Sequence, residues 1–114
     1  MIRPNGDDAD GRIATIPFVH GAADLPESAR ADLERAVREI KKDESARLQL
    51  VAYAKGSGDD AESQARRLSL SRALAVRSYL IDQGVRSTRM EVRALGNKVP
   101  DGQPDRVDIV LVHR

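Results

Sequence analysis

The fold of this 114-residue chain is decided by residues 62–84, which read ESQARRLSLSRALAVRSYLIDQG. At about 100° per residue, one face of this stretch collects apolar side chains, namely Leu68, Val76, Tyr79 and Leu80. Gly84 follows the last apolar position, where glycine commonly ends a helix. We therefore predict a long helix over residues 62–83 that packs through this face.

Working outward from this helix, the remaining apolar patterns predict the other elements. Residues 47–54 alternate, with Leu48, Leu50 and Ala52 on one face, as in a half-buried strand. Strands are also predicted over residues 13–19, 90–95 and 106–113, with Pro17 indicating an edge or a bulge in the first. The loops between these elements are residues 55–60 and 96–104.

A first helix is predicted over residues 26–42, because apolar residues recur there at helical spacing: Ala29, Leu33, Ala36, Val37 and Ile40. Asp24 stands three residues before Glu27, and Pro26 lies early in the first turn. This arrangement predicts a capping box, in which carboxylates accept hydrogen bonds from the free amides of the first turn.

The resulting element order predicts the fold class. Strand, helix, strand, helix, strand, strand is an α+β arrangement, a βαβαββ two-layer sandwich with a mixed sheet and both helices on one face. Residues 1–12 are polar and contain proline and glycine, so we expect a linker or a disordered N-terminus there. One domain is predicted over residues 13–114.

Composition excludes several classes of function. Aromatic residues make up only 3% of the chain, so a stacking surface for nucleic acid or sugars is not expected. The net charge of +1 provides no electrostatic basis for binding nucleic acid. Cysteine is absent, and no nucleophile or metal-ligand motif is present, so we expect no enzyme, metal or cofactor.

Arg72 lies in the middle of the apolar face of the predicted helix 62–83. A buried arginine needs an acidic or other anionic partner, because its guanidinium stays charged. One interpretation is structural, in which Arg72 pairs with Asp105 or Asp108 or extends to the rim of the core. The other is functional, in which it receives the carboxylate of a ligand.

The same helix resembles the signature of the OmpA-like domain family, Leu-Ser-x-x-Arg-Ala, x-x-Val, x-x-Tyr-Leu, then glycine and an aliphatic residue. Gly96 and Pro100 fit the family's later Gly-x-x-x-Pro loop. Its closing strand, in which basic residues precede Val-Glu-Ile, is similar to residues 105–109. The matching signature residues are Leu68, Ser69, Arg72, Ala73, Val76, Tyr79, Leu80, Gly84 and Val85.

This resemblance to peptidoglycan-associated lipoproteins, OmpA and flagellar stator domains implies a function. Such domains bind the peptide stem of peptidoglycan through an arginine, matched here by Arg72, which takes a carboxylate of diaminopimelate. An aspartate at the end of the second strand completes the site. The resemblance implies a periplasmic module of a membrane-anchored envelope protein, holding that protein to the cell wall.

The motif aspartate is replaced in this chain by Lys55. Asp59 and Asp60 in the following loop are candidate substitutes for it, and Lys55 could instead receive a second carboxylate; each could also be an ordinary surface residue. With Arg72 and Arg106, these residues form the predicted ligand-binding set. The alternative function is a degenerate OmpA-like domain that serves protein–protein interaction or assembly without binding the cell wall.

Three apolar residues fall on the opposite side of the predicted helix from Arg72. Leu70, Leu74 and Ile81 are expected to be exposed there. They are either scattered surface residues or a strip for a partner protein or a homodimer.

Overall fold

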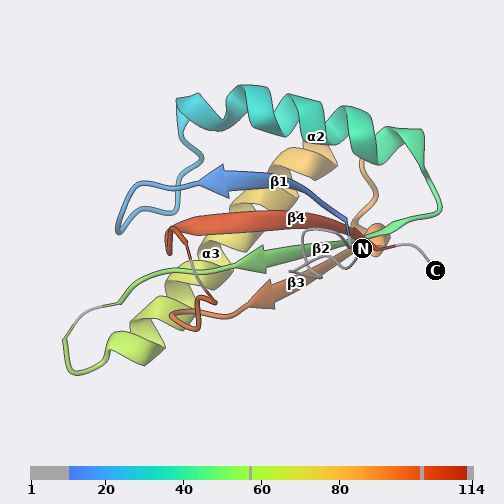
Figure 1. Cartoon of the computed structure of the whole chain (residues 1–114). Coiled ribbons are helices and arrows are strands. Elements are labelled where there is room, and N and C mark those ends of the chain that lie inside the picture. Colours follow the sequence, from blue (N-terminus) through green and yellow to red (C-terminus); the bar gives the residue numbers. More distant parts are fainter. Residues whose placement is uncertain (1–10, 57, 101, 113–114) are drawn as a thin grey trace, which may run out of the picture.

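The computed structural model describes residues 11–56, 58–100 and 102–112, which form a four-stranded sheet with two helices on one face (Figure 1). The elements in chain order are β1 (Arg12–Pro17), η1 (Glu27–Ala29), α2 (Arg30–Lys42), β2 (Arg47–Ala52), α3 (Ala61–Asp82), η2 (Ser87–Arg89), β3 (Met90–Ala94) and β4 (Arg106–Val112). The predicted βαβαββ order is confirmed. Of the predicted linker, residues 1–10 lie outside the described residues, and Arg12 already begins β1.

The sheet is mixed, as predicted, with the strand order β1-β4-β2-β3. β4 pairs antiparallel with both β1 and β2, whereas β2 and β3 are parallel. Parallel neighbours need a crossover connection, and α3 provides it between β2 and β3. β1 is an edge strand with an irregular register near Arg12, which agrees with the indication from Pro17.

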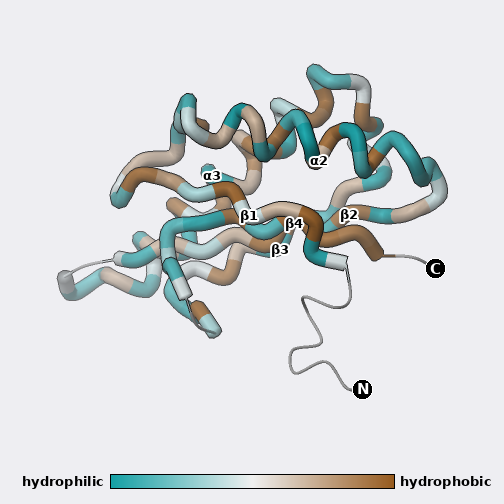
Figure 2. The backbone as a smooth tube through the Cα atoms, turned by 45° about the horizontal axis from the view of Figure 1, so that its top comes forward, coloured by the Kyte–Doolittle hydropathy of each residue, from teal (hydrophilic) through white to brown (hydrophobic). Residues whose placement is uncertain are grey.

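The core lies between the sheet and the two helices, and Figure 2 shows α2 and α3 on the same side of the strands. Leu48, Leu50 and Ala52 of β2 are fully buried on this side. The predicted core positions of the first helix are all buried: Ala29, Leu33, Ala36, Val37 and Ile40. Local periodicity therefore predicted the packed faces of β2 and α2 correctly.

The predicted capping box at the first helix is wrong. Pro26 occupies the N-cap of η1 in an extended conformation, and no side chain caps η1 or α2. The chain enters α2 through a 3₁₀ turn, in which the Ala29 amide donates to the Pro26 carbonyl at 3.0 Å. Asp24 stands two residues before this N-cap, too early to reach the amides that a capping box satisfies.

The orientation of α3 agrees with the prediction in its exposed side and differs slightly in its buried side. Leu70, Leu74 and Ile81 are 43%, 43% and 39% exposed, which confirms the predicted exposure. The buried face is centred nearer Ser69 than Leu68, because Ser69 is fully buried and Leu68 only half-buried. A hydroxyl in the core therefore has to be explained by its hydrogen bonds.

Ser69 joins α3 to the loop that follows β3. Its Oγ donates to the Arg66 carbonyl at 2.8 Å and accepts the Gly96 amide at 3.0 Å. Gly96 has φ +59°, and a Cβ there would lie 3.1 Å from the Arg66 nitrogen. The close approach of this loop to the helix therefore depends on the absence of a side chain at Gly96.

We expect Ser69→Ala to lower the free energy of unfolding by about 1–3 kcal/mol, because the buried Gly96 amide loses its acceptor. Chemical denaturation measures the change. Ser71→Ala is the matched control, since Ser71 is exposed on the same helix and its replacement should change stability by less than about 0.5 kcal/mol. Equal effects of the two substitutions would contradict the role given to Ser69.

Candidate ligand-binding site

Arg72 is the largest fully buried side chain among the described residues, and its guanidinium is held by four hydrogen bonds. Nη1 donates to Asp105 Oδ1 at 2.9 Å and to the Tyr53 carbonyl at 3.2 Å. Nε donates to the Ala22 carbonyl at 2.7 Å, and Nη2 to the Val19 carbonyl at 2.9 Å. The charge is thus matched by one carboxylate and three carbonyl dipoles.

The structural interpretation of Arg72 is confirmed as far as its partner is concerned, since Asp105 is one of the two acids predicted to pair with it. The Arg72 guanidinium makes no hydrogen bond to the described residues of the loop after β2. Apart from Tyr53, just after β2, the partners of Arg72 are two carbonyls of the turn at residues 19–22 and Asp105, just before β4. Arg72 therefore ties three separate segments to α3.

Asp105 is almost fully buried, yet its carboxyl group is held in the charged form. Burial alone raises the pKa of Asp105, but the hydrogen bond and positive charge of Arg72, with a smaller contribution from His20, lower it below the ordinary 3.8. His20 Nδ1 lies 3.4 Å from Oδ2, and its side chain is 66% exposed. Asp105 therefore lies between a buried cation and an exposed imidazole.

The lowered pKa of Asp105 predicts an acid-sensitive contribution to stability. A carboxyl group whose pKa is lower in the folded chain stabilises the fold above the unfolded pKa near 3.8, and this is lost as the pH falls through the folded pKa. We expect the difference in unfolding free energy between the wild type and Asp105→Asn to narrow as the pH is lowered from about 5 to 2. Urea denaturation at several pH values tests this, and a constant difference would contradict it.

The other predicted acids and Lys55 do not contact Arg72. Lys55, Asp59 and Asp60 are all exposed in the connection between β2 and α3. Asp60 instead lies 3.9 Å from the exposed Arg67. In the described part of the chain, Asp105 is thus the carboxylate that faces Arg72.

Arg106 lies on the opposite face of the sheet from Arg72. Successive residues of a strand point to opposite faces, and Arg106 alternates with the core residue Val107. Its guanidinium lies over the Tyr53 ring at 4.6 Å and donates to Asp108 Oδ2 at 3.3 Å. Asp108, the other acid predicted as a partner of Arg72, belongs to this second network and also accepts from Thr15.

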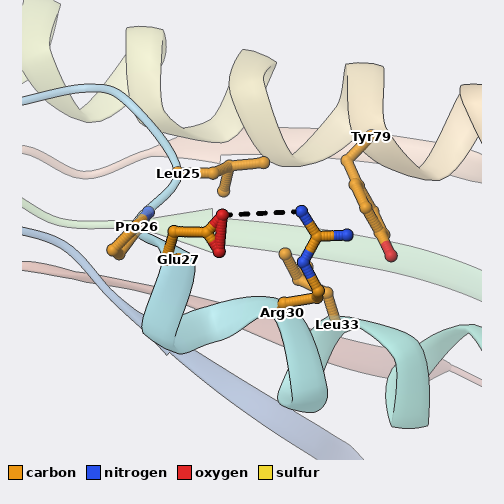
Figure 3. Close-up of a pocket in the computed structure, with 6 residues that line it drawn as sticks. All are labelled: Leu25, Pro26, Glu27, Arg30, Leu33 and Tyr79. Atoms are coloured by element: carbon orange, nitrogen blue, oxygen red, sulfur yellow. Dashed lines mark ion pairs between the residues drawn. The ribbon is translucent and has the colours of Figure 1, made fainter.

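A pocket of about 130 Å³ lies between α3 and the start of α2 (Figure 3), and Arg72 is not among the residues that line it. Leu25, Leu33 and Tyr79 provide apolar walls, and an ion pair between Glu27 and Arg30 at 3.7 Å lies at its side. Both charged side chains are mostly exposed. The volume is below the roughly 300–1,000 Å³ of typical small-molecule sites.

Sequence reasoning missed the turn at residues 18–22 as a part of this site. Two carbonyls from the turn hold Arg72, and the Phe18 ring lies 5.2 Å from its guanidinium carbon. Backbone carbonyls carry no side-chain identity, so no sequence pattern could have indicated these contacts. Asp105 was predicted only as a structural partner, although its second oxygen faces outward toward His20.

The arrangement of an inward arginine on α3, facing the ends of β2 and β4, coincides with the signature region of a known family. The profile of the OmpA family matches residues 17–106. The chain belongs to the OmpA family. Domains of this family are non-catalytic, generally bind peptidoglycan and are typically periplasmic parts of envelope proteins. No curated protein matched the sequence.

Solved structures share this OmpA-like fold. The peptidoglycan-associated lipoprotein of Burkholderia pseudomallei is 21% identical with a TM-score of 0.78, over 86% of this chain and 89% of that one. The C-terminal domain of Helicobacter pylori MotB is 18% identical with a TM-score of 0.75, over 90% and 86% of the two chains. The OmpA-like domain of FopA1 from Francisella tularensis is 22% identical with a TM-score of 0.70, over 87% and 71%.

These similarities establish the fold of the OmpA-like domain. Neither long helix in the described ranges has the length and apolarity needed to cross a membrane. The signature serine and arginine, Ser69 and Arg72, have definite structural roles here. Ser69 attaches a loop to α3, and Arg72 attaches the turn at residues 19–22 and the start of β4.

Proposed function

We propose that this domain binds peptidoglycan non-covalently and anchors to the cell wall an envelope protein of which it is the periplasmic part. Membership of the OmpA family supports the ligand class, and the fold is similar to a protein described as a peptidoglycan-associated lipoprotein. The observation that carries the proposal is the family arginine, Arg72, paired with a carboxylate, Asp105, at 2.9 Å.

The chemistry of the peptide stem suits a paired cation and anion. The free end of diaminopimelate carries a carboxylate and an ammonium group, which complement a guanidinium and a carboxyl group. Arg72 is the proposed main contact for the ligand carboxylate. Because Arg72 is fully buried under the turn at residues 19–22, binding requires this turn to shift.

The remaining predicted residues are proposed as outer contacts. Lys55, Asp59 and Asp60 are exposed where β2 leads into α3, so they can meet the stem without any rearrangement. Arg106 is the first residue of β4, and its side chain lies on the other face of the sheet, where it contacts Asp108 and Tyr53. It can contact the ligand only at the rim.

Retention of the domain by purified sacculi tests the proposal. We expect the wild type to sediment with sacculi, and Lys55→Asp to strengthen retention severalfold, because it removes a cation and adds an acceptor for the ammonium group. Lys41→Asp is the matched control: it makes the same charge change on an exposed residue near the end of α2 and should leave retention unchanged. A wild type that does not sediment with sacculi contradicts the anchoring function.

A second candidate function is a protein interaction module without cell-wall binding. Two observations favour it: four of the five N–H donors of Arg72 already bond to protein groups, and Leu70, Leu74 and Ile81 form an exposed apolar strip. The predicted homodimer would use this strip. Analytical ultracentrifugation of the isolated domain measures its oligomeric state. A wild-type dimer that Leu74→Glu converts to a monomer would support this function.

A further inference from the structure

Asp105 lies just before β4, and two hydrogen bonds hold its backbone. Its backbone carbonyl accepts the Phe18 amide at 2.9 Å, and its amide donates to Gln103 Oε1 at 3.3 Å. Oδ1 accepts from Arg72 in the core, so Oδ2 points toward the exposed His20. The group therefore has one inner oxygen, used by the protein, and one outer oxygen near solvent.

The outer oxygen is only weakly occupied. An ionised carboxyl group has about four acceptor positions, and the two side-chain contacts of Asp105 use two. The His20 contact is long, at 3.4 Å, and the His20 side chain is 66% exposed, so this contact contributes little. A stronger donor can replace His20 without breaking the bond to Arg72.

We propose that Asp105 is the carboxylate that receives the ammonium group of the stem, and that His20 occupies its outer oxygen while the domain is free. This inference rests on the proposed function. Asp105 would then supply the acid that is missing where Lys55 stands, from β4 instead of from the end of β2. His20 is on this account an internal competitor of the ligand.

The charges at the site select an amino-acid zwitterion over a simple amine. Arg72 and Asp105 together are neutral, so a ligand with equal numbers of positive and negative groups matches them without leaving a buried charge unpaired. Arg72 has five N–H donors and makes four hydrogen bonds to the protein. A ligand carboxylate can accept the remaining Nη2 hydrogen once the turn at residues 19–22 shifts.

Titration with a soluble stem tripeptide that ends in diaminopimelate tests the inference, with calorimetry for affinity and NMR of the His20 ring. We expect the ring signals to shift on binding to the wild type. Asp105→Asn should weaken binding roughly tenfold or more. His20→Ala should strengthen it roughly two- to fivefold, because the competing contact is lost. Thr88→Ala, an exposed change in η2 where the chain enters β3, is the control and should have no effect.

A modified ligand separates a binding role from a structural one. Asp105→Asn also perturbs Arg72. The same tripeptide, acetylated on the free amino group of its diaminopimelate residue, should therefore be tested on the unaltered protein. We expect it to bind the wild type as weakly as the unmodified tripeptide binds Asp105→Asn. The variant itself should not distinguish the two ligands, whereas a purely structural role would preserve the distinction.

The outcomes separate this inference from the anchoring function. If the wild type binds sacculi and tripeptide but Asp105→Asn binds equally well, the role of Asp105 is overturned and anchoring stands. If His20→Ala binds no more tightly, His20 is not a competitor. If the wild type binds neither sacculi nor tripeptide, the inference and the proposed function fail together.

Discussion

Arg72→Ala should destabilise the domain by about 3–5 kcal/mol, because it leaves the buried carboxylate of Asp105 without its partner. The same change removes the donors for three carbonyls, two of them in the turn at residues 19–22. It also leaves a cavity beneath the buried face of α3, where the Arg72 side chain is fully buried. Chemical denaturation at neutral pH measures the loss.

Arg67→Ala is the matched control for this prediction. Arg67 lies on the same helix, but its side chain is 68% exposed and 3.9 Å from the exposed Asp60. Exposed ion pairs contribute about 0–1 kcal/mol, so we expect a loss in that range. If both substitutions cost less than about 1 kcal/mol, Arg72 does not hold the three segments together.

Loss of sacculus retention in Arg72→Ala has two possible causes, a lost ligand contact and a disrupted turn at residues 19–22. Variants and ligands that leave Arg72 in place, such as Lys55→Asp and the acetylated tripeptide, avoid this ambiguity. For that reason the tests of function and of Asp105 do not depend on Arg72→Ala.

Gly56→Ala should also be strongly destabilising, by about 3 kcal/mol, because its Cβ would lie 2.0 Å from the carbonyl oxygen of Ala61. That oxygen belongs to the backbone at the start of α3, so it cannot move aside as a side chain would. The connection from β2 would have to open. Thermal unfolding of the variant against the wild type measures the effect.

Gly58→Ala, two residues away, is the control for Gly56→Ala. A Cβ at Gly58 would meet no atom within 4 Å, but φ is +82°, so only the strain of a left-handed backbone applies. We expect about 1 kcal/mol. A larger loss at Gly58 than at Gly56 would show that backbone conformation, not close packing, limits this loop.

The pattern of apolar residues along the chain was enough to predict which segments form helices and strands and which faces they bury. The period of the apolar residues in α2, β2 and α3 is local information, and it was enough to predict the buried set in α2 and the exposed Leu70, Leu74 and Ile81. The signature around Ser69 and Arg72 predicted the family, which the profile match shows. The local sequence pattern gave a wrong prediction at the start of α2, where the chain enters through a 3₁₀ turn after Pro26 and no side chain caps the helix.

Tertiary packing decides where the Arg72 guanidinium lies. Its partners lie 19 to 53 residues away along the chain, and three of the four are carbonyls that every residue possesses. It also decided that Asp105 and Arg106, adjacent in sequence, point to opposite faces of the sheet and serve separate networks. A periodic pattern states which side of an element is buried, but the partner of a buried charge depends on which distant backbone groups packing brings within about 3 Å.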